Sequence, residues 1–412
     1  MEKKKMGLPM QIFLALILGI VVGLVLYFAG AAEFTTSYLK SFGDIFVNLL
    51  KFIVVPVVLF SMIDGIISMG DMKKVGSVGW KTVAYFMVTT AIACVIGLVL
   101  ATLFNNAGLF PNLSEAAQSD EYEAKEYAGF MSTLVSIFPT NMWKSFTEAN
   151  MLQVIVMAIV LGFAIILVGE EKNSRVIQGF QDLNDIFMKC MELILRLSPI
   201  GVFCLLCPVI AANGPAIIGS LAMVLLAAYI CYIIHMAVVY SLTVKAIGGM
   251  SPLEFFKNMF PAMIFAFSSS SSVGTLPINM ECVEKMGVSK EVSSFVLPLG
   301  ATINMDGTAI YQGVCAIFIA SCYGIQLTLP QMLTIILTAT LASIGTAGVP
   351  GAGMVMLAMV LTSVGLPVDG IALVAGVDRI FDMGRTVVNI TGDASCCVVV
   401  HNLEKKKEMK KN

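Results

Sequence analysis

The sequence predicts an all-α protein that crosses a membrane several times. Of its 412 residues, 58% are hydrophobic and only 13% are charged, and the mean hydropathy is +0.90. Soluble proteins contain about 45–50% apolar and about 25% charged residues. The apolar residues form runs of about 20, the length that a helix needs to cross the hydrocarbon core of a bilayer.

Charge and cysteine usage exclude other classes of protein. The net charge of −2 gives no basic surface for nucleic acid, so no nucleic-acid partner is expected. The ten cysteines lie mostly in apolar runs and show no paired metal-ligand spacing. They are interpreted as free thiols that act as small apolar side chains.

Both ends of the chain are predicted to be cytoplasmic. The apolar run from about Leu8 to Phe28 is long enough to span the bilayer and has no small-residue cleavage site, so it is interpreted as a retained first span rather than a signal peptide. Lysines precede this span, and Lys405–Lys407 follow the last one. The positive-inside rule then requires an even number of full crossings.

Further spans follow in chain order. The second and third run over about 47–67, with Pro56 at its middle, and about 82–104. Residues 108–130 hold five acidic residues against one lysine and are expected to form an extracytoplasmic loop. Later apolar segments lie at about 151–169, 186–212 and 216–245.

Two apolar segments are interrupted at their centres, which predicts re-entrant helical hairpins. The first covers about 252–285 and is broken by the serine-rich stretch 268–277. The second covers about 329–366 and is broken by the glycine-rich stretch 343–353. Paired interruptions in the two halves of a transporter indicate a binding site near the bilayer midplane. The alternative is a pair of soluble linkers rich in serine and glycine, which the apolar flanks argue against.

The stretch Asn304–Thr308 places polar residues inside an apolar region from about 295 to 320. An aspartate at bilayer depth is costly and is a functional candidate by default. Irregular backbone there survives only against protein or a water-filled cavity. The alternative is a buried structural aspartate.

The last helix, about 370–400, has a polar stripe. Asp378, Asp382, Arg385, Asn389 and Asp393 are spaced by three and four residues, so they share one helix face. Each charge would cost about 2.5–3.5 kcal/mol in lipid. The stripe must therefore face protein, water or a ligand.

The residue types suit a cation and an acidic amino acid. Carboxylate, amide, hydroxyl and backbone oxygens are the ligands of Na⁺ in unwound transporter helices. Arg385 offers a planar fork for a carboxylate, and Asp382 suits an ammonium group. Arg385 could instead only neutralise Asp382. From other classes, an intramembrane aspartyl protease using Asp306 and Asp382 needs a carboxylate dyad, and a passive channel leaves the hairpins unexplained.

Four motifs in this order closely resemble the glutamate transporter family, the dicarboxylate/amino acid:cation symporters, especially their prokaryotic sodium–aspartate members. They are SSSVGTLP at 270–277, NMDGT at 304–308, ASIGTAGVPGAG at 342–353 and DMGRTVVNITGD at 382–393. The resemblance implies no enzyme. It implies a Na⁺-coupled symporter of L-aspartate and/or L-glutamate in the cell membrane. C4-dicarboxylate or neutral amino acid transport within the same family is the alternative.

The resemblance also implies an architecture. Eight transmembrane helices and the two hairpins form inverted repeats and assemble as a homotrimer in lipid. Residues 1–80 (helices 1 and 2) and 131–213 (helices 4 and 5) form a scaffold. Residues 81–107 (helix 3) and 214–412 form a transport domain that moves like an elevator. The latter range holds helix 6, hairpin 1, helix 7 at about 291–321, hairpin 2, helix 8 and the basic tail.

Site residues follow from the matching motif positions. The implied substrate residues are Ser271, Ser272, Met305, Thr308, Val349, Gly353, Asp382, Arg385, Thr386 and Asn389. The first sodium would bind Gly300, Asn304, Asn389 and Asp393. The second would bind Thr302, Met305, Ser343, Ile344 and Thr346. The third would bind the backbone of Phe86 and the side chains of Thr89, Thr90, Asn304 and Asp306.

Some positions depart from relatives. Ser270 stands where many archaeal members have arginine, and Met383 where animal members have arginine. Gln312 stands where proton-coupled animal members have glutamate, which argues against proton and potassium coupling of the animal kind. The retained NMDGT and helix-8 patterns favour sodium.

Overall fold

The computed structural model describes residues 8–70, 77–111, 135, 138–148, 151–168, 170–343 and 352–409. Every regular element in these ranges is helical, which confirms the predicted all-α class. The acidic loop predicted at 108–130 falls largely outside the described residues.

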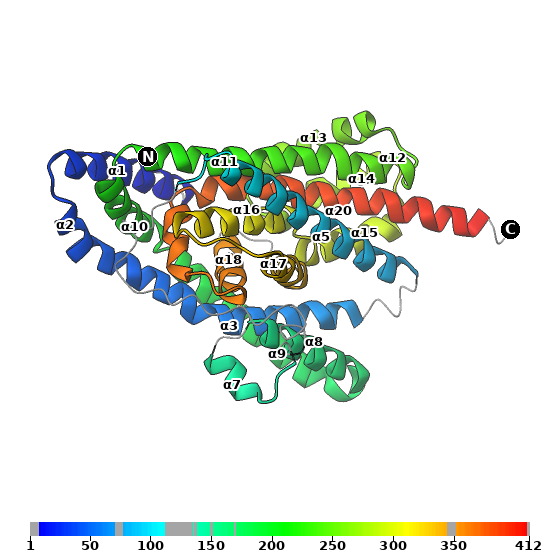
Figure 1. Cartoon of the computed structure of the whole chain (residues 1–412). Helices are drawn as coiled ribbons and strands as arrows, with labels where there is room; N and C mark the ends of the chain where they lie inside the picture. Colours follow the sequence, from blue (N-terminus) through cyan, green and yellow to red (C-terminus); the bar gives the residue numbers. More distant parts are fainter. Residues whose placement is uncertain are drawn as a thin grey trace, which may run out of the picture.

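The N-terminal helices pack mainly on one another. They are α1 (Leu8–Phe28), α2 (Ala32–Phe34), η1 (Thr35–Leu39), α3 (Lys40–Gly70), α7 (Met142–Thr147), α8 (Met151–Val168), α9 (Glu170–Leu195) and α10 (Ser198–Asn213). Helix α1 has the predicted bounds and packs along α10, while α3 packs against α8, α9 and α10. Figure 1 shows α3, α8 and α9 together along one side of the molecule.

The apolar segment predicted at about 186–212 is bent. This segment is divided between α9 and α10, which meet at 50° around Arg196–Leu197. Pro199 lies in the first turn of α10, where a proline is tolerated because the first amides of a helix have no partner within it. The sequence is therefore compatible with a new helix that begins at this bend.

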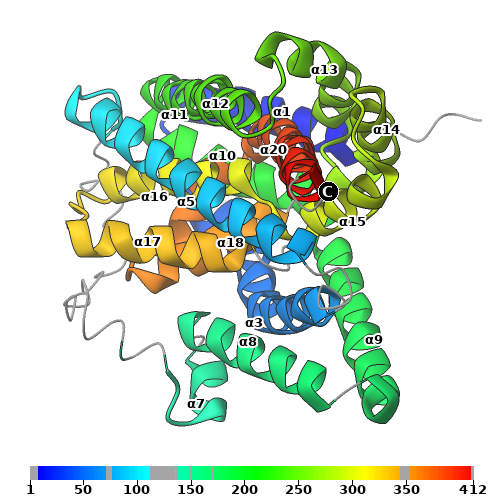
Figure 2. The same ribbon diagram turned by 90° about the vertical axis from the view of Figure 1, so that its right-hand side faces the viewer.

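A second group of helices surrounds the polar motifs. It contains α5 (Ser77–Asn106), α11 (Ala216–Ile234), η2 (His235–Tyr240), α12 (Ser241–Ala246), α13 (Pro252–Ser269), α14 (Ser272–Lys285), α15 (Lys290–Ile303), α16 (Asp306–Cys322), α17 (Leu329–Ala342), α18 (Ala352–Ser363), η3 (Val368–Gly370), α19 (Ile371–Ala375) and α20 (Asp378–Met409). Figure 2 shows α20 beside α11, α13 and α15.

Helix α16 is the central element. Every residue from Asp306 to Ala320 is buried, since α5, α11, α17, α18 and α20 all pack on this helix. A helix that is apolar all round belongs inside a bundle. The first turn of α16, which holds Asp306, Gly307 and Thr308 of the NMDGT motif, is thereby placed at the core.

Helix 7, predicted as one element over 291–321, is broken in two. Helix α15 ends at Ile303 and α16 begins at Asp306. Asn304 (φ −89°, ψ 105°) and Met305 (φ −126°, ψ 45°) leave the helical region. Helix 8, predicted at 370–400, comprises η3, α19 and the long α20, which continues through the basic residues Lys405–Lys407.

The two interrupted segments form helix pairs at the predicted positions. Helices α13 and α14 cover 252–285 and pack on each other, joined at Ser270 and Ser271. Helices α17 and α18 also pack together, and the chain between them, 344–351, lies outside the described residues. That either pair is re-entrant stays a prediction.

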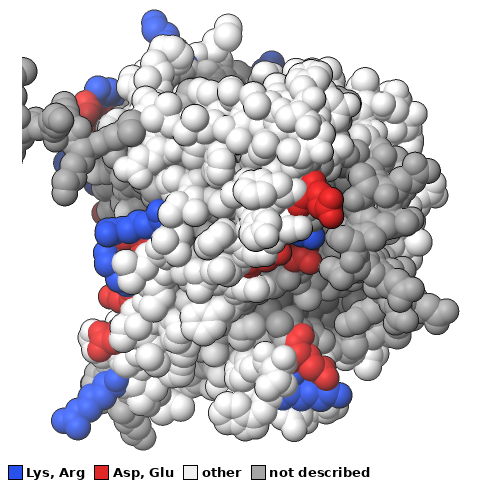
Figure 3. All heavy atoms as spheres, turned by 90° about the vertical axis from the view of Figure 1, so that its left-hand side faces the viewer, with Lys and Arg blue, Asp and Glu red and all other residues white. Residues whose placement is uncertain are grey.

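The outer surface suits a membrane. Figure 3 shows a face on which charged residues form only a few small groups. Among the described residues, three helices are long and apolar enough to cross a bilayer: Val78–Asn106, Ile218–Ala246 and Lys290–Cys322. The bent pair Arg175–Ile194 and Pro199–Ala212 would make a fourth. The count of eight spans stays a prediction.

Close packing between α5 and α16 yields a stability prediction. A Cβ on Gly97 would lie 2.8 Å from the Ile310 carbonyl oxygen, and backbone cannot move aside cheaply. We expect Gly97→Ala to destabilise the protein by about 1–3 kcal/mol. Gly219→Ala is the control, because a Cβ there meets nothing within 4 Å. Thermal unfolding in detergent measures both, and an equal melting temperature for the two variants would contradict this packing.

Candidate functional site

The break between α15 and α16 exposes backbone groups inside the core. The last carbonyls of a helix and the first amides of the next have no partner within the helix. One of these amides, that of Gly307, donates to Asn389 Oδ1 at 2.8 Å. A Cβ on Gly307 would collide with the Arg385 backbone, so glycine permits the close approach of α16 and α20.

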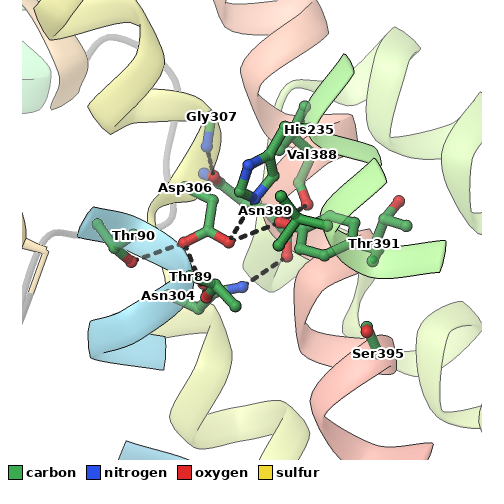
Figure 4. A network of polar contacts seen from close by, with 12 residues as sticks. Thr89, Thr90, His235, Asn304, Asp306, Gly307, Val388, Asn389, Thr391 and Ser395 are labelled. Atoms are coloured by element: carbon green, nitrogen blue, oxygen red, sulfur yellow. Dashed lines mark hydrogen bonds and ion pairs between the residues drawn. The ribbon is translucent and has the colours of Figure 1, made fainter. Parts of the chain in front are cut away.

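Asp306 is surrounded by hydrogen-bond donors. Its Oδ1 accepts hydrogen bonds from Thr90 Oγ1 at 2.6 Å and Thr89 Oγ1 at 3.3 Å, both on α5. Its Oδ2 lies 2.7 Å from the Tyr240 hydroxyl and 3.1 Å from His235 Nε2. Figure 4 shows Thr90 and His235 on opposite sides of the carboxylate. The aspartate is fully buried, and no lysine or arginine in the described ranges pairs with it.

A second buried carboxylate, Asp393, lies beside the break. Asn304 Nδ2 donates to Asp393 Oδ1 at 2.9 Å and to the Asn389 carbonyl at 3.0 Å. The other amide oxygen, Asn304 Oδ1, is buried without a hydrogen-bond partner. Gly300 lets Asp393 approach α15, because a Cβ there would overlap the carboxylate. Asp393 too forms no ion pair with a lysine or arginine of the described chain.

Asp306 and Asp393 together put two carboxyl groups into the core, one of them beside an amide oxygen without a partner. Buried charges require a compensating charge or metal. Within the described residues, no three His, Cys, Asp or Glu side chains are grouped to hold a metal ion. The available oxygens come instead from carboxylates, amides and hydroxyls, a donor set that suits a hard cation.

Arg385 lies one to two turns away on the same face of α20. Its Nε donates to Asp382 Oδ1 at 2.8 Å, and its Nη1 lies 3.4 Å from Asp378 Oδ1. The guanidinium carbon sits 4.9 Å from the centre of the Tyr311 ring, a cation–π arrangement. Nη2 is buried without a hydrogen-bond partner. This arginine therefore keeps one donor group for a further acceptor.

The Arg385 region is balanced in charge. Arg379 Nη1 lies 3.8 Å from Asp382 Oδ2, so two aspartates face two arginines. Gly353 at the start of α18 packs directly on the guanidinium, where a Cβ would collide with it. A zwitterion with one extra carboxylate could engage such a site through Asp382 and the free nitrogen of Arg385.

The tip of the first helix pair is shaped by two serines. Ser270 has φ +53°, the only non-glycine residue with positive φ among those described. Ser271 caps α14, and its Oγ accepts from the Gly274 amide at 3.0 Å. Ser272 is buried. The free amides at this helix N-terminus favour an anion.

Met305 connects the two polar regions. Its sulfur lies 3.2 Å from Asn389 Nδ2 and 3.7 Å from Thr308 Oγ1. Asn389 also binds Gly307 and, through its carbonyl, Asn304. A chain of direct contacts therefore joins the two regions.

A comparison with known proteins identifies the family of this chain. Residues 8–403 match the sodium:dicarboxylate symporter family. The chain belongs to this family. The resemblance inferred from the sequence is confirmed, and membership of this symporter family makes the protein a multi-pass membrane transporter rather than an enzyme, which rules out the protease alternative.

Relatives in the sodium:dicarboxylate symporter family match over nearly the full length. The proton/sodium-glutamate symport protein of Bacillus subtilis is 37% identical over 410 residues, covering 98% of this chain and 94% of the relative. The proton/glutamate-aspartate symporter of Escherichia coli is 34% identical over 421 residues, covering 100% and 96%. The C4-dicarboxylate transport protein of Bacillus subtilis is 34% identical over 402 residues, covering 97% and 94%.

Most residues that this family resemblance singled out lie together. The set around the break is Phe86, Thr89, Thr90, Gly300, Asn304, Asp306, Asn389 and Asp393. Thr89 Oγ1 lies 3.3 Å from the Phe86 carbonyl, which brings that backbone oxygen to the same place. Thr386 lies on α20 beside Arg385 and bonds back to the Asp382 carbonyl at 2.8 Å.

Only some residues of the second predicted sodium site lie in the described part of the chain. Thr302 Oγ1 bonds to the Leu299 carbonyl at 2.9 Å and Ser343 Oγ to the Thr340 carbonyl at 2.7 Å, both within their own helices. Ile344, Thr346 and the substrate residue Val349 lie outside the described residues.

Sequence reasoning missed His235 and Tyr240, the two donors to Asp306 Oδ2. A signal was available. His235 is one of two histidines in the chain and lies in the apolar segment 216–245, where an ionisable side chain is a functional candidate.

Proposed function

We propose that the protein is a Na⁺-coupled secondary symporter of acidic amino acids, L-aspartate and/or L-glutamate. The observation that carries the proposal is the pair of buried carboxylates, Asp306 and Asp393, without a lysine or arginine partner among the described residues. A co-transported cation supplies the missing charge, and Arg385 on the same helix face receives the acidic substrate.

One sodium site is assigned to Gly300, Asn304, Asn389 and Asp393. The unpartnered Asn304 Oδ1 supports it, because this oxygen lies in the same side chain that already holds Asp393 and the Asn389 carbonyl. Glycine at position 300 leaves room for the Asp393 carboxylate. These are hard oxygen ligands of the kind that Na⁺ requires.

A further site is assigned to Phe86, Thr89, Thr90, Asn304 and Asp306. The two threonine hydroxyls converge on Asp306 Oδ1, and hydroxyls can turn their lone pairs toward an ion. The remaining site, with Thr302, Met305, Ser343, Ile344 and Thr346, rests on the family resemblance alone.

The substrate is placed between the α13–α14 tip and α20. Asp382 binds the ammonium group, and Arg385 binds the side-chain carboxylate through its free Nη2. Ser271, Ser272 and the N-terminus of α14 bind the other carboxylate. Met305, Thr308, Thr386 and Asn389 line the site, and Val349 and Gly353 close it.

C4-dicarboxylate transport is the second candidate, because one relative bears that name. Asp382 argues against it, since a dicarboxylate has no ammonium group for a buried aspartate to bind. A neutral amino acid has no side-chain carboxylate for the unpartnered Nη2 of Arg385. The relatives' names also include protons, but Gln312 and the retained NMDGT motif favour sodium.

The proposed mechanism is an elevator movement within a homotrimer, with both termini cytoplasmic. Helix packing supports the division of the chain: α1, α3, α8, α9 and α10 pack mainly among themselves, and α5 packs with α15, α16, α17 and α20. The second group would carry substrate and ions past the first. Residues 1–80 with 131–213, and 81–107 with 214–412, are the two proposed bodies.

Uptake into liposomes tests the function. We expect purified protein to accumulate radiolabelled L-aspartate only under an inward Na⁺ gradient, because the ions supply both the charge balance and the driving force. Replacing Na⁺ by choline at the same pH gradient is the control. Uptake that persists undiminished in choline would refute sodium coupling.

Arg385→Cys tests the substrate assignment. Removing the guanidinium deletes the group that receives the side-chain carboxylate, so we expect aspartate binding to fall by at least about 100-fold. Neutral amino acids should then compete better than in the wild type. Arg196→Cys is a matched control, because Arg196 is exposed and its ion pair within the described chain is with the exposed Glu192, at 2.7 Å. Unchanged aspartate affinity in Arg385→Cys would show that this side chain does not bind substrate.

A further inference from the structure

Two side chains outside the proposed ion and substrate sites hold one oxygen of Asp306. His235 Nε2 lies 3.1 Å and the Tyr240 hydroxyl 2.7 Å from Oδ2. Both side chains are fully buried. Because a carboxylate only accepts hydrogen bonds, His235 presents its Nε2–H to Asp306 and leaves Nδ1 without a partner.

The backbone is built to aim both side chains at the same oxygen. His235 and Tyr240 are the first and last residues of the π-helical stretch η2. In an α-helix, residues five apart point about 140° away from each other. The i→i+5 pattern of a π-helix brings them to one side, and such turns are frequent at functional sites. Here the two rings meet edge to face, with centroids 4.7 Å apart.

The two oxygens of Asp306 therefore have separate surroundings. Oδ1 faces the Thr89 and Thr90 hydroxyls of α5 (Figure 4). Oδ2 is held from the η2 side, and the Tyr240 hydroxyl is in turn 3.2 Å from the Val388 carbonyl of α20. The carboxylate is thus oriented with one oxygen toward the threonines.

We propose that His235 and Tyr240 are positioning residues that orient Asp306 for Na⁺ and set the sodium affinity of the transporter. This inference rests on the proposed function. Groups that hydrogen-bond a metal-ligating side chain fix its direction, and their removal lowers metal affinity by about 10–100-fold. Without them, a buried carboxylate can rotate and is poorly compensated.

A pair of tyrosine variants tests the proposal. Tyr240→Phe removes the hydroxyl that donates to Asp306, whereas Tyr232→Phe removes a buried hydroxyl that has no hydrogen-bond partner. We expect Tyr240→Phe to raise the half-saturating Na⁺ concentration for aspartate uptake by about tenfold or more. Its aspartate half-saturation at saturating Na⁺ should stay near the wild-type value. Tyr232→Phe should match the wild type in both.

Histidine variants give an independent reading. His235→Gln keeps an N–H donor and should largely preserve sodium dependence, whereas His235→Leu keeps the bulk and loses the donor. We expect His235→Leu to weaken binding of radioactive sodium to substrate-free protein, and His235→Gln to restore it. If His235→Leu does not fold, the comparison of Tyr240→Phe with Tyr232→Phe still tests whether these side chains position Asp306.

Different results would overturn the positioning role of His235 and Tyr240 and the proposed function. Sodium dependence of Tyr240→Phe equal to that of the wild type would overturn the positioning role, as would equal losses in Tyr240→Phe and Tyr232→Phe. Wild-type uptake that ignores Na⁺ would instead overturn the proposed function itself, and this inference with it.

Discussion

The structure depends on keeping two carboxylates in a protein core without a lysine or arginine beside them. Asp306 and Asp393 are buried, and among the described residues they accept hydrogen bonds but pair with no lysine or arginine. In apolar surroundings an uncompensated carboxylate is strongly unfavourable. Amide, hydroxyl, phenol and imidazole donors reduce this cost without cancelling the charge. The remaining demand for positive charge is what makes a cation an obligatory companion in the proposed cycle.

The same arrangement explains how ions and substrate influence each other. The break at Asn304–Met305 brings backbone, amide and thioether groups into one contact chain from Asp393 to Thr308. Asn389 takes part at two points, because its carbonyl accepts from Asn304 and its side-chain amide contacts the Met305 sulfur. Coupling between two ligands is a reciprocal free energy, so a cation that orders these groups must strengthen substrate binding, and substrate must strengthen cation binding.

Sequence patterns predicted those parts of the fold that hydropathy and residue spacing determine. The apolar run of α1, the helix pairs at 252–285 and 329–366, and the polar face of α20 all follow from hydropathy and spacing. The bend after α9 and the break before Asp306 were not located, because each depends on packing partners as well as on the nearby residues. His235 and Tyr240 were missed since their spacing of five fits no α-helical face. Only the π-helical turn makes them neighbours.

The central claim is that aspartate binding requires the cation that neutralises this core. Calorimetric titration of purified protein with L-aspartate over a range of Na⁺ concentrations, at constant ionic strength, measures this most directly. We predict that the dissociation constant for aspartate falls steeply as Na⁺ replaces choline. A dissociation constant that stays the same across the whole range would contradict the account.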